Sequence, residues 1–206
     1  MTFGNAKSFA RIFAVAVLAG PLAACIAPTS YVDNTMKEIV PGQYQTVANP
    51  KPAQFLFDFQ TKGASNSRAR DELQDTVFAT VKESMIFSPV STDTQSSGAV
   101  VQVTINNVPL SDDAAVKGFM VGLTLGVAGT TVGDGYICTV QYSAGPGATP
   151  ITKEVRDAIY STIGATAPTP PHADKAPSMK EAAVRVARKC VSNALDQLVR
   201  DPAFPK

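Results

Sequence analysis

The chain has 206 residues but no tryptophan and only one histidine. Without tryptophan it lacks a common aromatic surface for stacking sugar rings. The histidine, His172, lies in a proline-rich stretch without a second ligand or a nucleophile motif, so it indicates a solvated loop residue rather than a catalytic base. The GxSxG, HExxH and GxxxxGK[ST] motifs are also missing from the sequence. These absences favour a protein with no catalytic residues, no metal and no cofactor.

An excess of charge of one sign is missing as well. The chain carries 18 basic and 17 acidic side chains, and this near-neutral balance argues against a nucleic-acid partner. Adjacent acids occur at Asp112–Asp113 and Asp71–Glu72, on an expected turn and an expected helix surface. Acids on exposed elements are usually solvated, so they do not indicate a glycosidase pair. A hydrolase built on His172 is the least favoured alternative.

The sequence has no apolar run long enough to span a bilayer as a helix. The run from Ile12 to Leu22 is too short, and it follows Lys7 and Arg11. Small residues come next, at Ala23 and Ala24. A positive segment, a short apolar segment and a small-residue cleavage site are typical of a secretory signal. Residues 1–24 are therefore predicted to be a signal peptide.

Leu22-Ala23-Ala24-Cys25 resembles the lipobox of bacterial lipoproteins, and this resemblance covers residues 1–25. It implies that the sulfur of Cys25 receives diacylglycerol and that Cys25 becomes the first residue of the mature chain. Ile26, rather than aspartate, follows it, which by resemblance to enterobacterial lipoproteins implies the outer membrane. The order of elements after residue 54 also resembles, loosely, a type of small proteobacterial outer-membrane lipoprotein, and brings no catalytic motif.

Three regions follow from this assignment. Residues 1–24 form the signal peptide, 25–53 the lipid anchor and a tether, and 54–206 a single periplasmic domain. The tether is rich in proline, threonine, asparagine and glutamine, and we expect it to be partly ordered through Tyr31, Val40 and Tyr44.

Periodicity predicts the elements of the domain. Apolar residues alternate over 54–60 and 101–105, which indicates strands, and they recur every four residues over 68–87, which indicates a helix. Ser178 and Glu181 form a capping-box pattern before an apolar helical stripe that ends near residue 198. Two apolar runs around Gly133-Asp134-Gly135 predict a hairpin over 118–142. Residues 151–163 fit a strand or a helix, and their β-prone composition favours the strand.

Two amphipathic helices and several half-buried strands must cover each other's apolar faces. The sequence therefore predicts an α+β fold, a two-layer sandwich with two helices on one face of an antiparallel sheet of four to five strands, in the order β-α-β-β-β-β-α.

Two cysteines remain besides Cys25. An exported protein folds in an oxidising compartment, where Cys138 and Cys190 can form a disulfide. Two separate buried thiols fit the sequence equally well, because the geometry of the fold decides the pairing.

The glycine-rich run is the least ordinary segment. If it is a strand, one of its faces carries almost no side chains and can lie against a membrane or a partner: Gly118, Met120, Gly122, Thr124 and Gly126. The alternative is a central strand covered on both sides. Only sixteen residues, Gly118 to Gly133, are free of charge here, fewer than a spanning helix needs.

The leading hypothesis is a non-enzymatic, lipid-anchored protein of the outer membrane, with its domain on the periplasmic face, that binds an envelope protein or lipid. The second hypothesis is a structural protein that self-associates, or enters the membrane, through the 118–142 hairpin.

Overall fold

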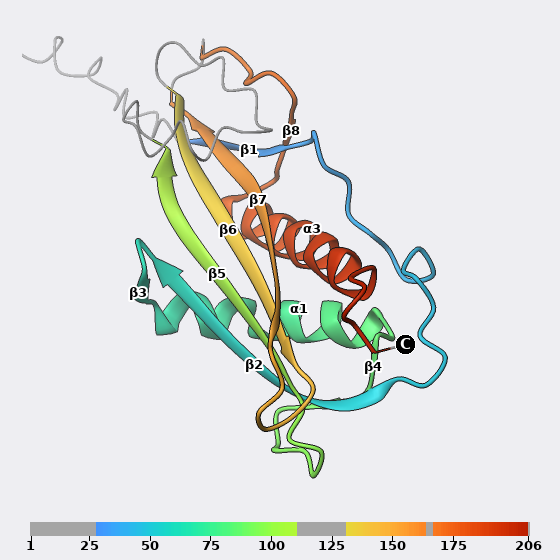
Figure 1. The fold of residues 1–206 in the computed structure, drawn as a ribbon. Coiled ribbons are helices and arrows are strands. Elements are labelled where there is room, and N and C mark those ends of the chain that lie inside the picture. Colours follow the sequence, from blue (N-terminus) through green and yellow to red (C-terminus); the bar gives the residue numbers. More distant parts are fainter. Residues whose placement is uncertain (1–27, 111–130, 164–166, 206) are drawn as a thin grey trace, which may run out of the picture.

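The computed structural model describes residues 28–110, 131–163 and 167–205, and within them it contains two helices and eight strands. The strands form one sheet, and both helices lie behind it in Figure 1. The predicted α+β class with helices on one face is confirmed, with more strands than expected. The strands are β1 (Thr29–Asp33), β2 (Lys51–Thr61), β3 (Ala64–Ser65), β4 (Phe87–Ser91), β5 (Val100–Leu110), β6 (Thr131–Ser143), β7 (Ile151–Thr162) and β8 (Ala173–Lys175), and the helices are α1 (Ser67–Glu83) and α3 (Met179–Val199).

The sheet is mixed rather than antiparallel. Its order is β3-β2-β5-β6-β7-β1-β8, with β4 also beside β2. The strands from β5 to β8 pair antiparallel, as predicted, but β2 runs parallel to both β4 and β5. The cause is α1, which follows β2 and returns the chain to the end of the sheet where β2 began. β4 and β5, the next two strands after the helix, therefore run in the same direction as β2.

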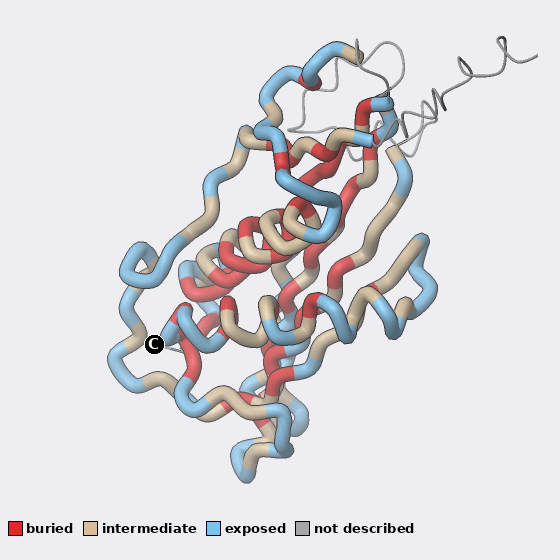
Figure 2. The backbone as a smooth tube through the Cα atoms, turned by 180° about the vertical axis from the view of Figure 1, so that it is seen from behind, coloured by how far each residue is buried: buried red, intermediate tan, exposed pale blue. Residues whose placement is uncertain are grey.

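The hydrophobic core lies between the sheet and the helices. Along β5, Val101, Val103 and Ile105 are fully buried, whereas Gln102 between them is exposed on the other face. Buried residues follow the strands beneath the helices and the inner side of α3 (Figure 2). Burial of one such aliphatic side chain contributes about 1.5–3 kcal/mol. The period-two pattern of the sequence thus sets which face the helices cover.

Helix α1 is shorter than predicted. Asn66 begins it, because its side-chain oxygen accepts a hydrogen bond from the backbone N–H of Ala69 at 3.1 Å. Leu73, Val77 and Val81 are buried as the periodicity predicts. The helix ends at Glu83, and Met85, expected on the buried stripe, has a positive φ of 58° and is 66% exposed. The left-handed backbone at Met85 turns the chain into β4.

Helix α3 begins at the predicted capping residue. The hydroxyl of Ser178 accepts a hydrogen bond from the backbone N–H of Glu181 at 3.1 Å. The other half of the capping box is replaced, because the carboxylate of Glu181 accepts from Arg185 Nε one turn further along. The start of the helix is therefore as predicted, but only one of the two reciprocal bonds is made.

The predicted hairpin turn at Gly133-Asp134-Gly135 is wrong. These residues lie inside β6, where Gly133 pairs with Leu110 on one side and with Tyr160 on the other. A Cβ at Gly133 would lie 3.1 Å from the Cβ of Leu110, so the glycine leaves room for that side chain. The residues that connect β5 to β6 are 111–130, which lie outside the described residues. The strand favoured for 151–163 is confirmed as β7.

The described part of the predicted tether, residues 28–53, is part of the fold. β1 pairs with β7 and β8, and Val32 contributes to the core. Beyond β1 the chain follows α3, where Ser192 Oγ accepts from the backbone N–H of Ile39 at 3.1 Å. Tyr44 packs against the core, whereas Val40 is 45% exposed. The described residues before 54 thus pair with the sheet and pack against its core, a closer association than the partial order expected of a tether.

Candidate functional site

Two sets of predicted site residues lie outside the described residues. The first is Cys25, with the signal peptide 1–24. The second is the glycine face: Gly118, Met120, Gly122, Thr124 and Gly126. The chain leaves β5 at Leu110 and enters β6 at Thr131, and these two positions lie at the same end of the sheet as the start of β1 (Figure 1).

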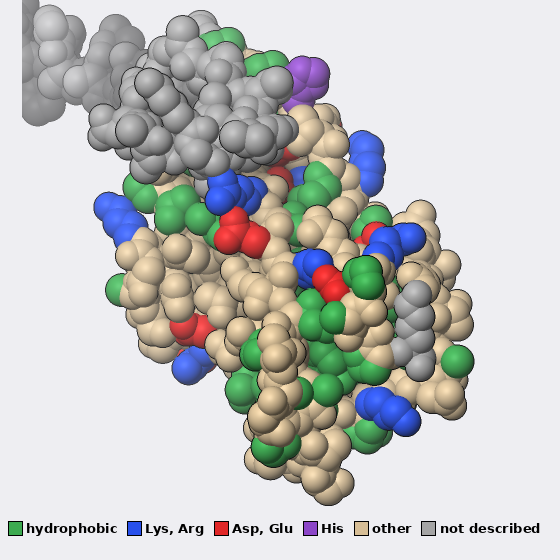
Figure 3. All heavy atoms as spheres, viewed as in Figure 1, with side chains coloured by type: hydrophobic (Ala, Val, Ile, Leu, Met, Phe, Trp, Pro, Cys, Tyr) green, Lys and Arg blue, Asp and Glu red, His purple; other side chains and the backbone are tan. Residues whose placement is uncertain are grey.

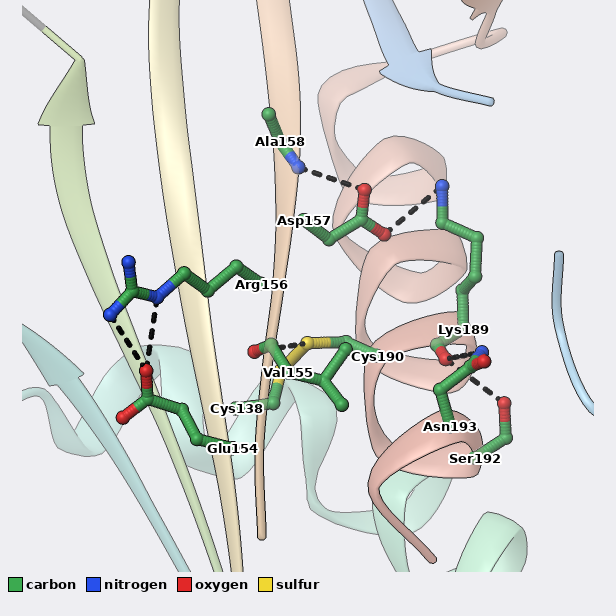
Figure 4. Close-up of a disulfide and its surroundings, with 10 residues drawn as sticks. All are labelled: Cys138, Glu154, Val155, Arg156, Asp157, Ala158, Lys189, Cys190, Ser192 and Asn193. Carbon is green, nitrogen blue, oxygen red and sulfur yellow. Dashed lines mark hydrogen bonds and ion pairs between the residues drawn. A yellow bond between two sulfur atoms is a disulfide. The ribbon is translucent and has the colours of Figure 1, made fainter. Parts of the chain in front are cut away.

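The structure brings together the two cysteines whose pairing the sequence left open. Cys138 lies on the helix-facing side of β6, and Cys190 on the inner face of α3 (Figure 4). Their sulfur atoms form a disulfide at 2.16 Å, with the Cα atoms 6.0 Å apart, and both residues are fully buried. The bond ties the C-terminal helix covalently to the middle of the sheet.

A buried ion pair lies beside the disulfide. Asp157 on β7 places Oδ2 3.0 Å from Lys189 Nζ on α3, and these side chains are 1% and 10% exposed (Figure 4). The other oxygen, Oδ1, accepts a hydrogen bond from the backbone N–H of Ala158 at 2.8 Å. Within the described residues Oδ2 accepts no hydrogen bond, and the ion pair with Lys189 is the contact that stabilises its charge.

The same lysine holds β1. Lys189 Nζ donates to the backbone carbonyl of Asp33, and the Asp33 carboxylate accepts from Tyr160 Oη at 3.4 Å and from the backbone N–H of Thr35 at 2.9 Å. Asp33 and Tyr160 are 2% and 1% exposed. We call Asp33, Asp157, Tyr160 and Lys189 the buried polar cluster. It links β1, β7 and α3.

Burial dominates the electrostatics of this cluster. It raises the pKa of Asp157 to about 7, and the neighbouring Lys189 offsets part of that rise. Burial also raises the pKa of Tyr160 above its usual range, and the Asp33 carboxylate raises it further. A carboxyl group with this pKa is characteristic of catalytic acids, but here no substrate can reach it, because its side chain is almost completely buried. The cluster therefore acts as a structural connection.

Sequence reasoning missed this cluster, although it left a signal. Asp157 alternates with Val155 and Ile159 on the buried face of β7, and Lys189 precedes Cys190 on the inner side of α3. A single charge within each apolar pattern, of opposite sign, is what a buried pair between a strand and a helix requires. Only the register of α3 on β7 shows that the two charges meet.

A second polar contact fastens the segment that follows β1. Arg188 on α3 donates to Glu38 at 2.9 Å and lies 3.8 Å from Glu83 of α1. Beside it, burial raises the pKa of Tyr44 to about 12. The hollow that these residues line has a volume of about 10 Å³, room for about one water molecule and far below the volume that small-molecule sites usually occupy. We therefore interpret these contacts as holding the segment after β1 against α1 and α3, and not as a ligand site.

The remaining candidates from the sequence are solvated. His172 is exposed, and its backbone carbonyl accepts from the N–H of Asn34. Asp71 pairs with its neighbour Arg70, and Glu72 lies 3.5 Å from Lys180. Asp112 and Asp113 lie outside the described residues. Within the described ranges, no three His, Cys, Asp or Glu side chains are grouped closely enough to hold a metal ion.

The face of the sheet opposite the helices carries different side chains at its two ends. Figure 3 shows the side of the molecule that is seen in Figure 1, with hydrophobic, charged and other side chains mixed on its surface. Toward the start of β1 it carries a small apolar cluster, in which Ala158 and Tyr160 are buried. Toward the start of β7 it carries exposed Gln102, Gln141 and Thr152, which are neighbours across β5, β6 and β7. Tyr31, Val108, Leu110, Ile137 and Ala173 complete the apolar cluster. The two ends of the sheet therefore differ in polarity.

Within the residues that the structure describes, no helix is both long and apolar enough to cross a membrane.

No family model matches the sequence, and no curated protein matches it. Solved structures to which the chain is similar include a PelC variant from Paraburkholderia phytofirmans, described as a dodecamer, at 11% identity and a TM-score of 0.33, covering 72% of this chain and 91% of that one. Another is a protein from Xanthomonas campestris assigned to the family DUF330, at 13% identity and a TM-score of 0.30, covering 80% of this chain and 88% of that one. Likenesses this distant carry no argument about what this chain does.

Proposed function

We propose that the protein is a lipid-anchored component of the bacterial cell envelope, held in the outer membrane by diacylglycerol on Cys25. Its domain binds an envelope protein or lipid and catalyses no reaction. The lipobox-like Leu22-Ala23-Ala24-Cys25 is the starting point of the proposal.

The observation that carries the proposal is the position of β1. The first described strand starts at Thr29, four residues after Cys25, and is hydrogen-bonded into the sheet. Cleavage before Cys25 would therefore leave every described element intact. An anchored Cys25 would also be connected directly to the folded domain, through three residues.

The covalent link between β6 and α3 supports export. A buried disulfide persists in the oxidising compartments outside the cytosol and is rare inside it. Cys138 and Cys190 are 52 residues apart in the chain and meet only in the folded domain. Their disulfide fits a protein that folds after crossing the inner membrane.

Binding rather than catalysis is proposed because of where the reactive groups lie. The carboxyl group with the raised pKa, Asp157, is enclosed between β7 and α3, and Asp33 and Tyr160 are equally buried. The surfaces that the domain presents to its surroundings include the open face of the sheet and the two ends of the strands (Figure 1).

Replacing Cys25 with serine tests the anchor, because serine has no sulfur to receive diacylglycerol. We expect Cys25→Ser to lose incorporation of labelled palmitate and to leave the membrane fraction. The matched control is Cys138→Ser, which removes a different cysteine and should keep both the label and the membrane association. Labelled, membrane-bound Cys25→Ser protein would contradict the proposal. Separation of the inner and outer membranes on a density gradient shows whether the wild-type protein is in the outer membrane.

A further inference from the structure

The anchor and the first strand together restrict how the domain can lie on a membrane. Thr29 is the fourth residue after Cys25, and a fully extended chain covers at most about 3.6 Å per residue. Thr29 is therefore within roughly 14 Å of the anchored residue. If Cys25 is lipidated as proposed above, the start of β1 must lie close to the membrane surface.

The start of β1 marks one end of the whole sheet. Thr29 pairs with Thr162, the last residue of β7, and Thr162 pairs with Thr131, the first residue of β6. We call this the Thr29 end. The opposite end, where β7 begins, is the Ile151 end. From Val132 to Gln141 along β6 the two ends are separated by nine residues, or roughly 30 Å at about 3.4 Å per residue.

Exposed apolar side chains lie at the Thr29 end. Val132 is 55% exposed and Ile163 is 51% exposed, although both are large aliphatic residues. They are neighbours in space, because Val132 pairs with Ser161 and Ile163 lies two residues further along the chain. Leu56 and Met85 are exposed at the opposite end, so the length of chain to the anchor, and not exposure, assigns the membrane to the Thr29 end. Val132 and Ile163 are the exposed aliphatic side chains that a membrane at this end would cover.

The surrounding residues suit a lipid surface. Across β6, β7 and β1, the last three rows of paired residues carry no charged side chain, and the first charge appears at Asp134. The rows are Thr131-Thr162-Thr29, Val132-Ser161-Ser30 and Gly133-Tyr160-Tyr31. Ser30, Tyr160 and Thr162 in these rows are buried. The partly exposed Thr29, Tyr31 and Ser161 are the side chains that can face headgroups, and the exposed Lys175 of β8 lies beside Tyr31.

We propose that the Thr29 end of the sheet lies on the membrane and that Val132 and Ile163 contact the acyl-chain boundary there. This inference rests on the proposed lipid anchor. It adds the orientation of the domain: the strands point away from the membrane, and the Ile151 end lies furthest from it. The open face between the two ends, which becomes more polar with distance from Thr29, is left free.

The missing tryptophan makes this orientation measurable. The chain contains none, so each single-tryptophan variant carries one fluorescent reporter. Val132→Trp and Ile163→Trp place the reporter at the Thr29 end. Leu56→Trp and Met85→Trp are matched controls, because these residues are 41% and 66% exposed and lie toward the Ile151 end. All four positions are exposed, so the larger side chain should be tolerated, which urea denaturation checks.

The full-length lipidated variants are reconstituted into vesicles of phosphatidylethanolamine and phosphatidylglycerol containing acyl-brominated phosphatidylcholine. We expect bromine to quench Val132→Trp and Ile163→Trp severalfold more than Leu56→Trp and Met85→Trp, and the emission of the first two to shift to shorter wavelength. Equal quenching at both ends, or stronger quenching at Leu56 and Met85, on protein that stays bound to the vesicles would overturn the orientation alone. If neither the wild type nor the variants float with the vesicles or carry lipid, the proposed anchor is wrong, and the orientation that rests on it is wrong as well.

Discussion

Lys189→Met should lower the free energy of unfolding by about 3–5 kcal/mol at pH 8, because it leaves the Asp157 carboxylate buried without an opposite charge. Methionine has nearly the volume of lysine and lacks its charge, so the packing of α3 against the sheet should change little. The lysine also holds the carbonyl of Asp33, so β1 should loosen in the same variant. The midpoint of urea denaturation measures the loss.

The size of this effect should depend on pH in a defined direction. Burial raises the pKa of Asp157 to about 7, from 3.8 in the unfolded chain, so the folded state binds more protons than the unfolded state between these values. The stability that this group contributes is therefore present at low pH and decreases as the pH rises toward 7. Without Lys189 the pKa rises further, so the penalty of Lys189→Met should be smaller at pH 5 than at pH 8.

Two controls separate the buried pair from a general effect of losing a lysine. Lys180→Met removes an exposed lysine 3.5 Å from Glu72 and should change stability by less than about 0.5 kcal/mol. The double variant Asp157→Asn/Lys189→Met keeps the acceptor for the Ala158 N–H but removes both charges, and it should recover most of the loss. If Lys189→Met alone is as stable as the wild type at pH 8, the account of the buried polar cluster is contradicted.

Removal of the disulfide should lower the free energy of unfolding by a similar amount. In the chain-entropy treatment, a cross-link between residues 52 apart restricts the unfolded chain by about 4 kcal/mol, and measured losses are commonly about 2–5 kcal/mol. We therefore expect Cys138→Ala/Cys190→Ala to be destabilised by a few kcal/mol, since both side chains are also buried in the core. Urea denaturation with and without a thiol reductant measures this loss.

The reductant provides the matched control. Wild type should become about as unstable as the double alanine variant when reduced, and the variant itself should not respond. If instead reductant leaves the wild type unchanged, and both thiols are alkylated in unreduced protein after unfolding, the cysteines are not paired in the cell.

The parts of the fold that follow from periodicity could be predicted from the sequence. Alternation predicted β2 and β5, and helical apolar spacing predicted α1 and α3, because these elements each bury one continuous apolar face. For β7 the spacing fitted a strand or a helix, and the β-prone composition favoured the strand. β1 has no such pattern: Ser30 and Asp33 are both buried through pairing with neighbouring strands rather than through apolar character. Its place in the sheet depends on partners more than a hundred residues away.

The strand β6 and the parallel pairing of β2 also depend on contacts between distant parts of the chain. Gly133 and Gly135 look like turn residues, yet both lie within β6, where Gly133 leaves space for the side chain of Leu110. The direction of β2 depends on the crossover through α1, which local patterns do not describe. For the candidate site, the sequence identified Cys138 and Cys190 but left open whether they form a disulfide. It did not predict the ion pair between Asp157 and Lys189.

These features connect the anchor to the domain in a specific way. β1 begins four residues after Cys25, pairs with β7, and is held to α3 by Lys189, which neighbours the disulfide-bonded Cys190. A lipid on Cys25 would thus lie close to a strand that is hydrogen-bonded into the sheet and held to α3. Under the proposed anchoring, this short connection would restrict the position of the domain at the membrane surface.

The intact mass of the protein purified from membranes tests the central claim most directly. We predict a chain that begins at Cys25, carries the added mass of diacylglycerol and a further acyl group, and has two fewer hydrogens than the reduced form because of the disulfide. A chain that retains residues 1–24, or one with an unmodified Cys25, would contradict it.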